Sequence, residues 1–325
     1  MNKIRIGVIG TGNMGRNHVR VAKNLQDLYE FVGIYDKNKE QADRIAKANS
    51  VTAFDELDQM LDLVDAVVVA VPSSLHKEIG LQVAEHGVHA LIEKPLATVS
   101  SDARLLADAF TGKGLKLMVG HIERFNPVIL ELNKVLQDKT VFHIEGHRFS
   151  PFSGSGRITD TSVVEDLMIH DVDLVCHLMK DRKIRSVTGA GEHVQTPNLD
   201  FATSMLVFEG GAHATLSASR VSQTKERSYY IHATDCSIYA DLLARTLTIS
   251  TNANLVIDTS QANSYMQEGA VQKIYVPIQE PLQSELIEFH HVLTGDHAAA
   301  VDGAVGVRAI EICEEIVQKA EGGLK

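Results

Sequence analysis

The sequence contains few cysteines, and their placement argues against two kinds of stabilising site. Cys176, Cys236 and Cys313 are the three cysteines among 325 residues, and they form no Cys-x-x-Cys pair. An odd number of distant cysteines supports neither a disulfide framework nor a zinc site built from thiolates. We therefore expect a protein of a reducing compartment, the cytoplasm.

Long apolar runs and an excess of basic residues are also missing. No apolar run reaches the roughly 18 residues that a membrane span needs. The N-terminal MNKIRIGVIG leads into a glycine-containing strand pattern and not into the apolar region of a signal peptide. The formal net charge of -11 argues against a general nucleic-acid binder. We expect neither a membrane nor a nucleic acid as a partner.

The chain is longer than one hydrophobic core usually supports. Its 325 residues, 44% of them hydrophobic, are enough for two cores. No internal repeat, low-complexity tract or long linker marks a boundary, but the pattern of strands and helices changes near residue 120. We predict one domain over residues 1–120 and a second over 121–325.

The first domain begins with a strand, a glycine turn and a helix. The β-branched run KIRIGVIG covers residues 3–10, and a helical pattern follows the glycines. Gly10, Gly12 and Gly15 form a G-x-G-x-x-G motif at this junction. In a dinucleotide site these glycines permit the tight turn, the approach of a pyrophosphate and the packing of helix on strand, while helix N-terminal amides bind phosphate oxygens.

A second strand, FVGIYD, ends at Asp36, about 20 residues beyond the glycines as the dinucleotide fingerprint requires. A carboxylate there accepts hydrogen bonds from ribose hydroxyls and repels a 2′-phosphate, which favours NAD over NADP. Lys37 and Lys39 weaken that preference, so NADP stays open. The alternative is that Asp36 only starts a turn.

Further strand and helix patterns alternate up to residue 120. DAVVVAVP over residues 65–72 is an unbroken apolar run, typical of a parallel strand buried on both faces. Strand patterns recur at 88–95 and 115–121, with helical crossovers between them. We therefore predict an α/β domain, a doubly wound parallel sheet of the Rossmann type that binds a dinucleotide.

The second domain has a different pattern. Strand-like segments at 139–149, 183–194 and 201–208 precede a hairpin signal, Glu209-Gly210-Gly211. We predict an α+β domain with a large, mainly antiparallel sheet. A helix over 162–179 would cover one face and leave the other for a partner subunit. The closing helices could pack back on the first domain.

The helix over 162–179 is rich in titratable side chains. Ser162 and Glu165 fit the Ser-x-x-Glu capping box of a helix N-terminus. At 3.6 residues per turn, four later side chains fall on one stripe. This stripe is compatible with a solvated face, a metal site or an acid/base pair. Its members are Asp166, His170, Asp173 and His177.

Two motifs resemble the glucose-fructose oxidoreductase and inositol dehydrogenase family (Gfo/Idh/MocA). The first is Glu93-Lys94-Pro95 at the end of a strand, behind GTGNMG at 10–15 and AVPSSLH at 70–76. The second is Asp166-x-x-x-His170. The resemblance covers essentially the whole chain. It implies an NAD(P)-dependent dehydrogenase acting on CH-OH groups, assembled as a homodimer or homotetramer through the C-terminal sheet.

The resemblance also implies catalytic roles. His170 is the expected base, since a neutral imidazole suits proton removal near pH 7. Lys94 is expected to hydrogen-bond the reacting oxygen, and Asp166 to orient the imidazole or contact a sugar hydroxyl. We predict no metal, because ligands along one helix need others to close the coordination shell. The expected cofactor contacts are Gly10, Gly12, Asn13, Met14, Gly15, Asp36, Pro72, His76, Glu93 and Lys94.

Three segments resemble the branch of the family that oxidises UDP-sugars such as UDP-N-acetylglucosamine, at C3. These segments are 120–127, 156–174 and 217–227. The open alternatives are a dehydrogenase of a free sugar or cyclitol, and a dinucleotide or sugar sensor without turnover. Arginines are candidates for the diphosphate because guanidinium groups bind phosphate through paired hydrogen bonds. The predicted substrate contacts are His121, Arg124, Asn126, Arg148, Arg157 and Arg220.

Overall fold

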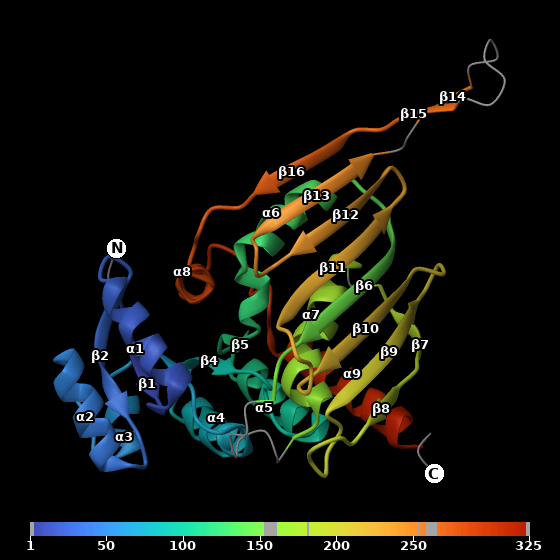
Figure 1. Ribbon diagram of the computed structural model, residues 1–325. Coiled ribbons are helices and arrows are strands. Elements are labelled where there is room, and N and C mark those ends of the chain that lie inside the picture. The colour runs from blue at the N-terminus through green and yellow to red at the C-terminus, as the bar shows by residue number, and fades with distance from the viewer. Residues whose placement is uncertain (1–2, 153–160, 181, 252–253, 258–264, 323–325) are drawn as a thin grey trace. The chain divides into compact units, whose positions relative to one another are not determined.

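The glycine turn of the N-terminal motif follows the first strand of a parallel sheet, as expected. The structure is a computed structural model that describes residues 3–152, 161–180, 182–251, 254–257 and 265–322. The chain divides into two units (Figure 1). Unit 1 contains Met1–Phe125 and Glu280–Glu314, and unit 2 contains Asn126–Gln279 and Glu315–Lys325.

Unit 1 is built on a five-stranded sheet with the order β2-β1-β3-β4-β5, and all of its strand pairs are parallel. Apolar runs form its centre: all four side chains of β3 are fully buried. The strands are β1 (Ile4–Ile9), β2 (Tyr29–Tyr35), β3 (Ala66–Val69), β4 (His89–Glu93) and β5 (Leu117–Gly120).

Helices connect and cover these strands. Helix α1 packs against α8, and α4 packs against α5. The strand order changes direction between β1 and β3, which is where ligands of open α/β sheets bind, at the carboxyl ends of the strands. The helices are α1 (Asn13–Asn24), α2 (Lys39–Asn49), α3 (Leu57–Leu61), η1 (Ser73–Leu75), α4 (His76–Glu85), α5 (Ser100–Gly112), η2 (Ile122–Phe125) and α8 (Pro281–Thr294).

Unit 2 is built on a nine-stranded sheet in which β6 and β10 are parallel and the other pairs are antiparallel. The order is β16-β13-β12-β11-β6-β10-β9-β7, and β8 pairs with β9. The strands are β6 (Val141–Phe149), β7 (Ile184–Val187), β8 (Ala190–Glu192), β9 (Phe201–Phe208), β10 (His213–Ser219), β11 (Glu226–Ala233), β12 (Cys236–Asp241), β13 (Thr246–Thr251) and β16 (Val271–Tyr275). A separate pair joins β14 (Asn254–Ile257) and β15 (Tyr265–Glu268).

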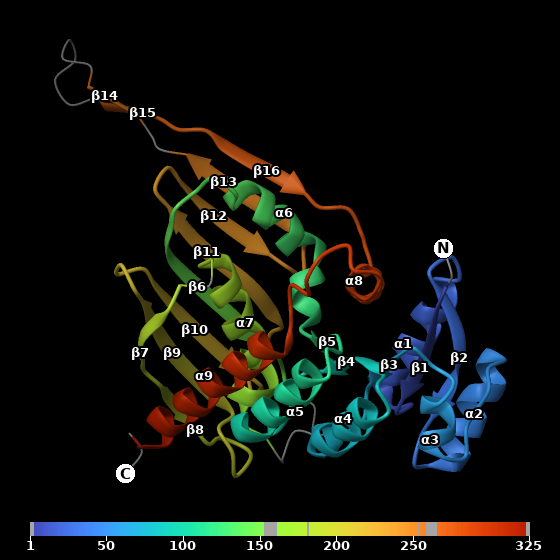
Figure 2. The ribbon, with the colours of Figure 1, turned by 180° about the vertical axis from the view of Figure 1, so that it is seen from behind.

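One face of the large sheet carries helices. Figure 2 shows α6 (Pro127–Leu136) and α7 (Ile169–Leu178) on this face, where α6 contacts β12 and β13, and α7 contacts β6 and β10. Alternate strand residues point towards the helices: Ile144 and Leu216 are fully buried, whereas His143 and Thr215 are half-buried. This alternation is what a half-covered antiparallel sheet requires.

The predicted hairpin joins β9 and β10. Gly210 and Gly211 have φ angles of +84° and +85°, in the left-handed region that glycine adopts without strain. The amide of Phe208 donates to the Ala212 carbonyl oxygen at 2.8 Å and closes the turn. The last helix, α9 (Gly303–Gly322), contributes residues to both units. Among the described residues, no helix is both long enough and apolar enough to cross a membrane.

Candidate active site

The glycine turn lies between β1 and α1 and leaves one side of the backbone open. Gly10 has a φ of +88°, and a Cβ there would lie 2.6 Å from the carbonyl oxygen of Ala70. A Cβ on Gly15 would lie 1.9 Å from the Gly10 carbonyl oxygen, whereas one on Gly12 would meet nothing within 4 Å. Gly10 and Gly15 are therefore needed for the conformation of the turn, and Gly12 leaves space beside the turn backbone for a ligand.

That space lies at the start of α1. Gly12 precedes the helix, and no side chain caps its N-terminus. Asn13 is exposed and Met14 is half-buried in the first turn. Backbone amides at such a terminus bind phosphate oxygens. The turn therefore fits the pyrophosphate of a dinucleotide.

Asp36 follows β2 and faces the glycine turn. Its Oδ2 accepts hydrogen bonds from the amide and the hydroxyl of Thr11, both at 2.7 Å, and its Oδ1 accepts one from the Asn38 amide at 2.8 Å. The carboxylate is thus fixed beside the phosphate-binding turn. Of the two nearby lysines, Lys39 is exposed and donates to Asp55 at 3.1 Å, and Lys37 is exposed.

Lys94 lies in the turn after β4 and is half-buried. The ring of His76, at the start of α4, joins this turn to the one after β3. Its Nδ1 is 2.7 Å from the Pro95 carbonyl oxygen, and its Nε2 is 3.0 Å from the Val71 carbonyl oxygen, beside Pro72. Burial lowers the pKa of His76, and the neutral ring can donate to one of these two carbonyls. His76 is therefore a buried link between two loops.

The other predicted residues of this region are largely buried. His121 follows β5 and is almost fully buried. The buried Arg124 donates from Nη1 to the Ala300 carbonyl oxygen at 3.0 Å. Asn126 caps α6, since its side-chain oxygen accepts a hydrogen bond from the Val128 amide at 3.0 Å. Asn126 belongs to unit 2, and His121 and Arg124 belong to unit 1.

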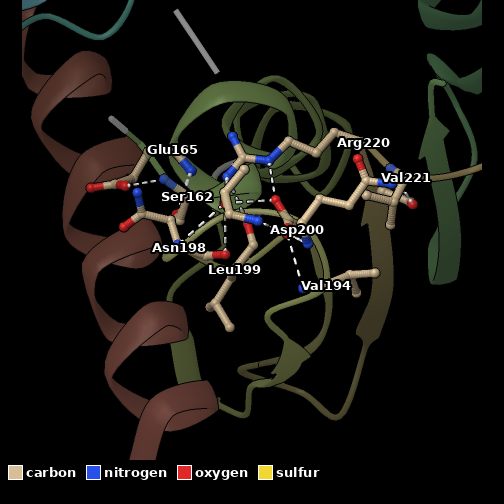
Figure 3. Close-up of polar contacts among 11 residues, drawn as sticks. Ser162, Glu165, Val194, Asn198, Leu199, Asp200, Arg220 and Val221 are labelled. Atoms are coloured by element: carbon tan, nitrogen blue, oxygen red, sulfur yellow. Dashed lines mark hydrogen bonds and ion pairs between the residues drawn. The ribbon is translucent and has the colours of Figure 1, made fainter. Parts of the chain in front are cut away.

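The helix of the second motif begins with the predicted capping box (Figure 3). The Ser162 amide donates to Glu165 Oε2 at 2.9 Å, and the Glu165 amide donates back to Ser162 Oγ at 3.3 Å. The capping prediction is confirmed.

The expected α-helical stripe is wrong in its first turn. The segment η4 (Val164–Met168), which contains Asp166, is π-helical, and α7 begins only at Ile169. A π-turn holds more residues than an α-turn, so Asp166 is rotated away from the position that 3.6 residues per turn would give it. Asp166, His170 and His177 are half-buried, and Asp173 is buried. Such π-turns are frequent at functional sites.

Arg148 forms a buried ion pair that holds α7 on the sheet. Its Nε donates to both carboxylate oxygens of Asp171, at 3.0 and 2.9 Å, and the Tyr229 hydroxyl donates to the same carboxylate. All three side chains are buried. Because Asp171 follows His170 directly, this contact with β6 and β11 fixes the part of the helix that carries His170.

Arg220 forms a second buried ion pair, with Asp200 (Figure 3). Its Nε donates to Asp200 Oδ1 at 2.8 Å. The Leu199 carbonyl oxygen accepts from Arg220 Nη2 at 3.2 Å and from the Val163 amide at 2.8 Å. Burial alone would raise the pKa of Asp200, but hydrogen bonds from the Gln195 and Thr196 amides and from Arg220 outweigh it and hold that pKa well below its usual value.

The loop around Asp200 therefore supports the first turn of the helix that contains Asp166. Sequence reasoning did not identify Asp171, Asp200 or Tyr229, because their partners are distant in the sequence. Arg157, a predicted substrate contact, lies outside the described residues. Within the described ranges, no three His, Cys, Asp or Glu side chains are grouped so that they could hold a metal ion.

Comparisons with known proteins point to one family. A family profile described as an oxidoreductase family with an NAD-binding Rossmann fold (GFO_IDH_MocA) matches residues 4–121, and the GFO/IDH/MocA C-terminal domain matches residues 138–239. The chain is 30% identical over 325 residues to the UDP-N-acetylglucosamine 3-dehydrogenase of Acidithiobacillus ferrooxidans, covering 100% of both chains. A solved structure of that enzyme has a TM-score of 0.87, 29% identity and full coverage of both chains.

Other relatives are named as dehydrogenases of free sugars or cyclitols. An inositol 2-dehydrogenase/D-chiro-inositol 3-dehydrogenase of Halalkalibacterium halodurans is 29% identical over 193 residues, which cover 57% of this chain and 55% of that protein. A levoglucosan dehydrogenase solved in complex with NADH has a TM-score of 0.85 with 19% identity, covering 99% of this chain and 98% of that one. At that identity the likeness shows a common fold.

Proposed function

The chain belongs to the Gfo/Idh/MocA family of oxidoreductases, and from that premise we propose that it oxidises the C3 hydroxyl of UDP-N-acetylglucosamine, or of a close relative, with NAD. Its membership of this family makes the chain a dehydrogenase. The observation that carries the choice of substrate is the similarity to a UDP-N-acetylglucosamine 3-dehydrogenase over the full length of both chains. The similarity to the inositol dehydrogenase covers little more than half of each chain.

Unit 1 has the features that a dinucleotide needs. The open side of Gly12 and the uncapped start of α1 leave room for a pyrophosphate. The Asp36 carboxylate would accept hydrogen bonds from the ribose hydroxyls. Bound NAD would supply the hydride acceptor. Asn13, Met14, Pro72 and Lys94 complete the proposed contacts, while the buried His76 holds the loops that contain Pro72 and Lys94.

Oxidation of a secondary alcohol releases a hydride from carbon and a proton from oxygen. We assign removal of the hydroxyl proton to His170, because a neutral imidazole accepts protons near pH 7. Lys94 donates a hydrogen bond to the same oxygen and stabilises its developing negative charge. Asp166 orients His170 or binds a neighbouring hydroxyl of the sugar. The supports found for α7, Asp171 and Asp200, favour a helix held in one orientation.

The diphosphate of the substrate needs cationic or amide partners. Arg148 and Arg220 already bond buried carboxylates, so we assign them to the support of the helix and not to the diphosphate. Arg157, His121, Arg124 and Asn126 stay as proposed substrate contacts. We further propose that the uncovered face of the large sheet joins a second copy of the chain, in a dimer or a tetramer, and that the protein is cytoplasmic.

A UDP-sugar should be a better substrate than the corresponding free sugar, because nucleotide and diphosphate contacts provide binding energy that positions the reacting ring. NADH absorbance can be followed with UDP-N-acetylglucosamine, N-acetylglucosamine, glucose and myo-inositol. We expect the highest kcat/KM for the UDP-sugar. Higher values for inositol or glucose than for every UDP-sugar tried would move the chain to the free-sugar branch, and NAD binding without turnover of any of them would favour a sensor.

NAD should bind more tightly than NADP, because Asp36 repels the 2′-phosphate. Calorimetric titration of the wild-type protein should give a dissociation constant for NADP that is about tenfold or more above that for NAD. Asp36→Ser removes the charge and should narrow the gap between the two dissociation constants, whereas Asp108→Ser is a matched control at an exposed carboxylate on α5. Tighter NADP binding by the wild-type protein would contradict this role of Asp36.

A further inference from the structure

Lys94 directly follows the last residue of β4, and the sheet pairs that residue on one side only. Glu93 pairs with Gly120 of β5, whereas the pairing of β4 with β3 ends one residue earlier, at Ile92 and Val69. The strand ladder therefore restrains the start of the Lys94 turn from β5 but not from β3. A further restraint on this turn has to come from side chains.

The side chain of Glu93 is held by a buried histidine of α1. His18 has a relative exposure of 0%, and its Nε2 lies 2.7 Å from Glu93 Oε1. An ionised carboxylate only accepts hydrogen bonds, so the imidazole donates from Nε2. The Nδ1 atom of His18 has no hydrogen-bond partner among the described residues. The hydrogen bonding of this ring is thus directed at Glu93.

The Glu93 carboxylate is almost fully buried and fits closely. Opposite, on β5, a Cβ on Gly120 would lie 3.1 Å from Glu93 Oε2, so the glycine leaves room for the carboxylate. A buried carboxylate without a donor is strongly unfavourable, which favours keeping this side chain on His18. The sequence pattern suggested Glu93 as a contact of the cofactor, and in the structure its Oε1 is bonded within the protein.

A second buried histidine contacts the residue that follows Lys94. The Nδ1 atom of His76, at the start of α4, lies 2.7 Å from the Pro95 carbonyl oxygen. The residues before and after Lys94 are thus each in contact with a buried histidine, one from α1 and one from α4. Of these two helices, α1 is also the one whose N-terminus forms the proposed pyrophosphate site.

We propose that His18 is a positioning residue for Lys94: it holds the Glu93 side chain and thereby the backbone that carries the lysine. Because His18 lies on α1, one helix then aligns both the cofactor and the lysine. A displacement of a reacting group by about 1 Å can cost about 100-fold in rate, so a contact of this kind affects turnover. The proposal rests on the proposed function, since it takes Lys94 as the group that bonds the reacting oxygen.

Two amide substitutions separate the hydrogen bond from the volume of the ring. In His18→Gln the amide nitrogen can take the place of Nε2, whereas in His18→Asn it reaches only the place of Nδ1, one bond short of Glu93. Single-turnover hydride transfer should stay within about threefold of wild type for His18→Gln and fall about tenfold for His18→Asn. The dissociation constant for NAD should stay within about twofold in both, because the phosphate-binding turn lies more than one helical turn earlier.

The matched control is His86→Asn, at another contact between a histidine and a carboxylate. His86 follows α4, and its Nε2 lies 3.1 Å from Asp58 Oδ1. This variant should transfer hydride at the wild-type rate. Thermal melting of all three variants shows that each is folded at the temperature of the assay.

A double-mutant cycle with Lys94→Ala tests whether His18 acts through the lysine. If it does, His18→Asn should cost about tenfold when Lys94 is present and less than about twofold in the Lys94→Ala background. A residue that only stabilises the fold would lower both rates by the same factor. The assay uses whichever alcohol the wild-type enzyme oxidises with NAD, so a substrate other than UDP-N-acetylglucosamine leaves this test intact.

Hydrogen exchange provides a measurement without substrate. In the protein without NAD, the amides of the turn after β4 should exchange faster in His18→Asn than in wild type, and at the wild-type rate in His18→Gln and His86→Asn. If this pattern is found and no UDP-sugar is oxidised, only the proposed function fails. Unchanged exchange in His18→Asn, a folded His18→Gln variant as slow as His18→Asn, or equal factors in the two arms of the cycle would overturn the proposal.

Discussion

Replacing His170 by alanine should lower the rate of hydride transfer about 100-fold or more, the usual cost of losing a general base. NAD affinity should be nearly unchanged, because His170 belongs to unit 2 and the glycine turn belongs to unit 1. Single-turnover absorbance with enzyme in excess measures the chemical step, and calorimetric titration measures NAD binding. Lys94→Ala should also slow the step, through weaker charge stabilisation on the reacting oxygen.

Asp173→Asn and His177→Gln are the controls for His170→Ala, because they change titratable groups of the same helix. Asp173 is buried, so its replacement should lower the melting temperature more than the rate of hydride transfer. Metal content measured on all four variants separates acid/base chemistry from a metal site. Hydride transfer near the wild-type rate in folded His170→Ala, or stoichiometric metal that is lost with His170 or His177, would defeat the assignment.

Alanine at Gly15 and alanine at Gly12 should have different effects on stability and similar effects on the cofactor. At Gly15 the new Cβ would lie 1.9 Å from the Gly10 carbonyl oxygen, so the turn between β1 and α1 must move. We expect the free energy of unfolding to fall by about 1–3 kcal/mol or more, as in an overpacked core, together with lost NAD binding. Thermal melting and calorimetric titration check both.

At Gly12 nothing of the protein lies within 4 Å of the new Cβ, so the melting temperature should stay close to wild type. NAD should bind more weakly, because this glycine allows the backbone to approach the pyrophosphate. Unchanged NAD affinity in a folded Gly12→Ala variant would mean that the phosphates bind elsewhere. A Gly15→Ala variant as stable as wild type would contradict the geometry of the turn.

Local patterns in the sequence were sufficient for several features. The run before Gly10 predicts β1, and the three glycines predict the turn, because backbone conformation and close packing depend on neighbours in the chain. Ser162 and Glu165 predict their reciprocal bonds for the same reason, since a capping box involves only four consecutive residues. The hairpin at Gly210 and Gly211 is equally local.

Contacts between distant residues could not be predicted in this way. The partners of Arg148 and Arg220 lie 23 and 20 positions away, and nothing in the sequence distinguishes these buried arginines from surface ones. Their carboxylates come from a helix and a loop that meet the sheet only after folding. His18 is also undistinguished in the sequence: it is one histidine of an amphipathic helix, and its partner Glu93 lies 75 positions away.

The π-turn is a further feature that the sequence pattern did not predict. The periodicity argument assumed 3.6 residues per turn throughout, which predicts one stripe from Asp166 to His177. The residue before the π-turn is held by a distant contact: the Leu199 carbonyl oxygen, in the loop that Asp200 and Arg220 hold, accepts from the Val163 amide. The geometry at the start of the Asp-x-x-x-His motif, to which we assign the catalytic base, therefore could not be predicted from a uniform helical period.

The most direct test of the proposed function follows one hydrogen atom. UDP-N-acetylglucosamine deuterated at C3 is incubated with the wild-type enzyme in excess and NAD, and the NADH formed is analysed by mass spectrometry. The account predicts that each NADH carries one deuterium, together with a ketone on the sugar. NADH without deuterium would place the oxidation at another carbon, and no NADH from any UDP-sugar would contradict the proposed activity.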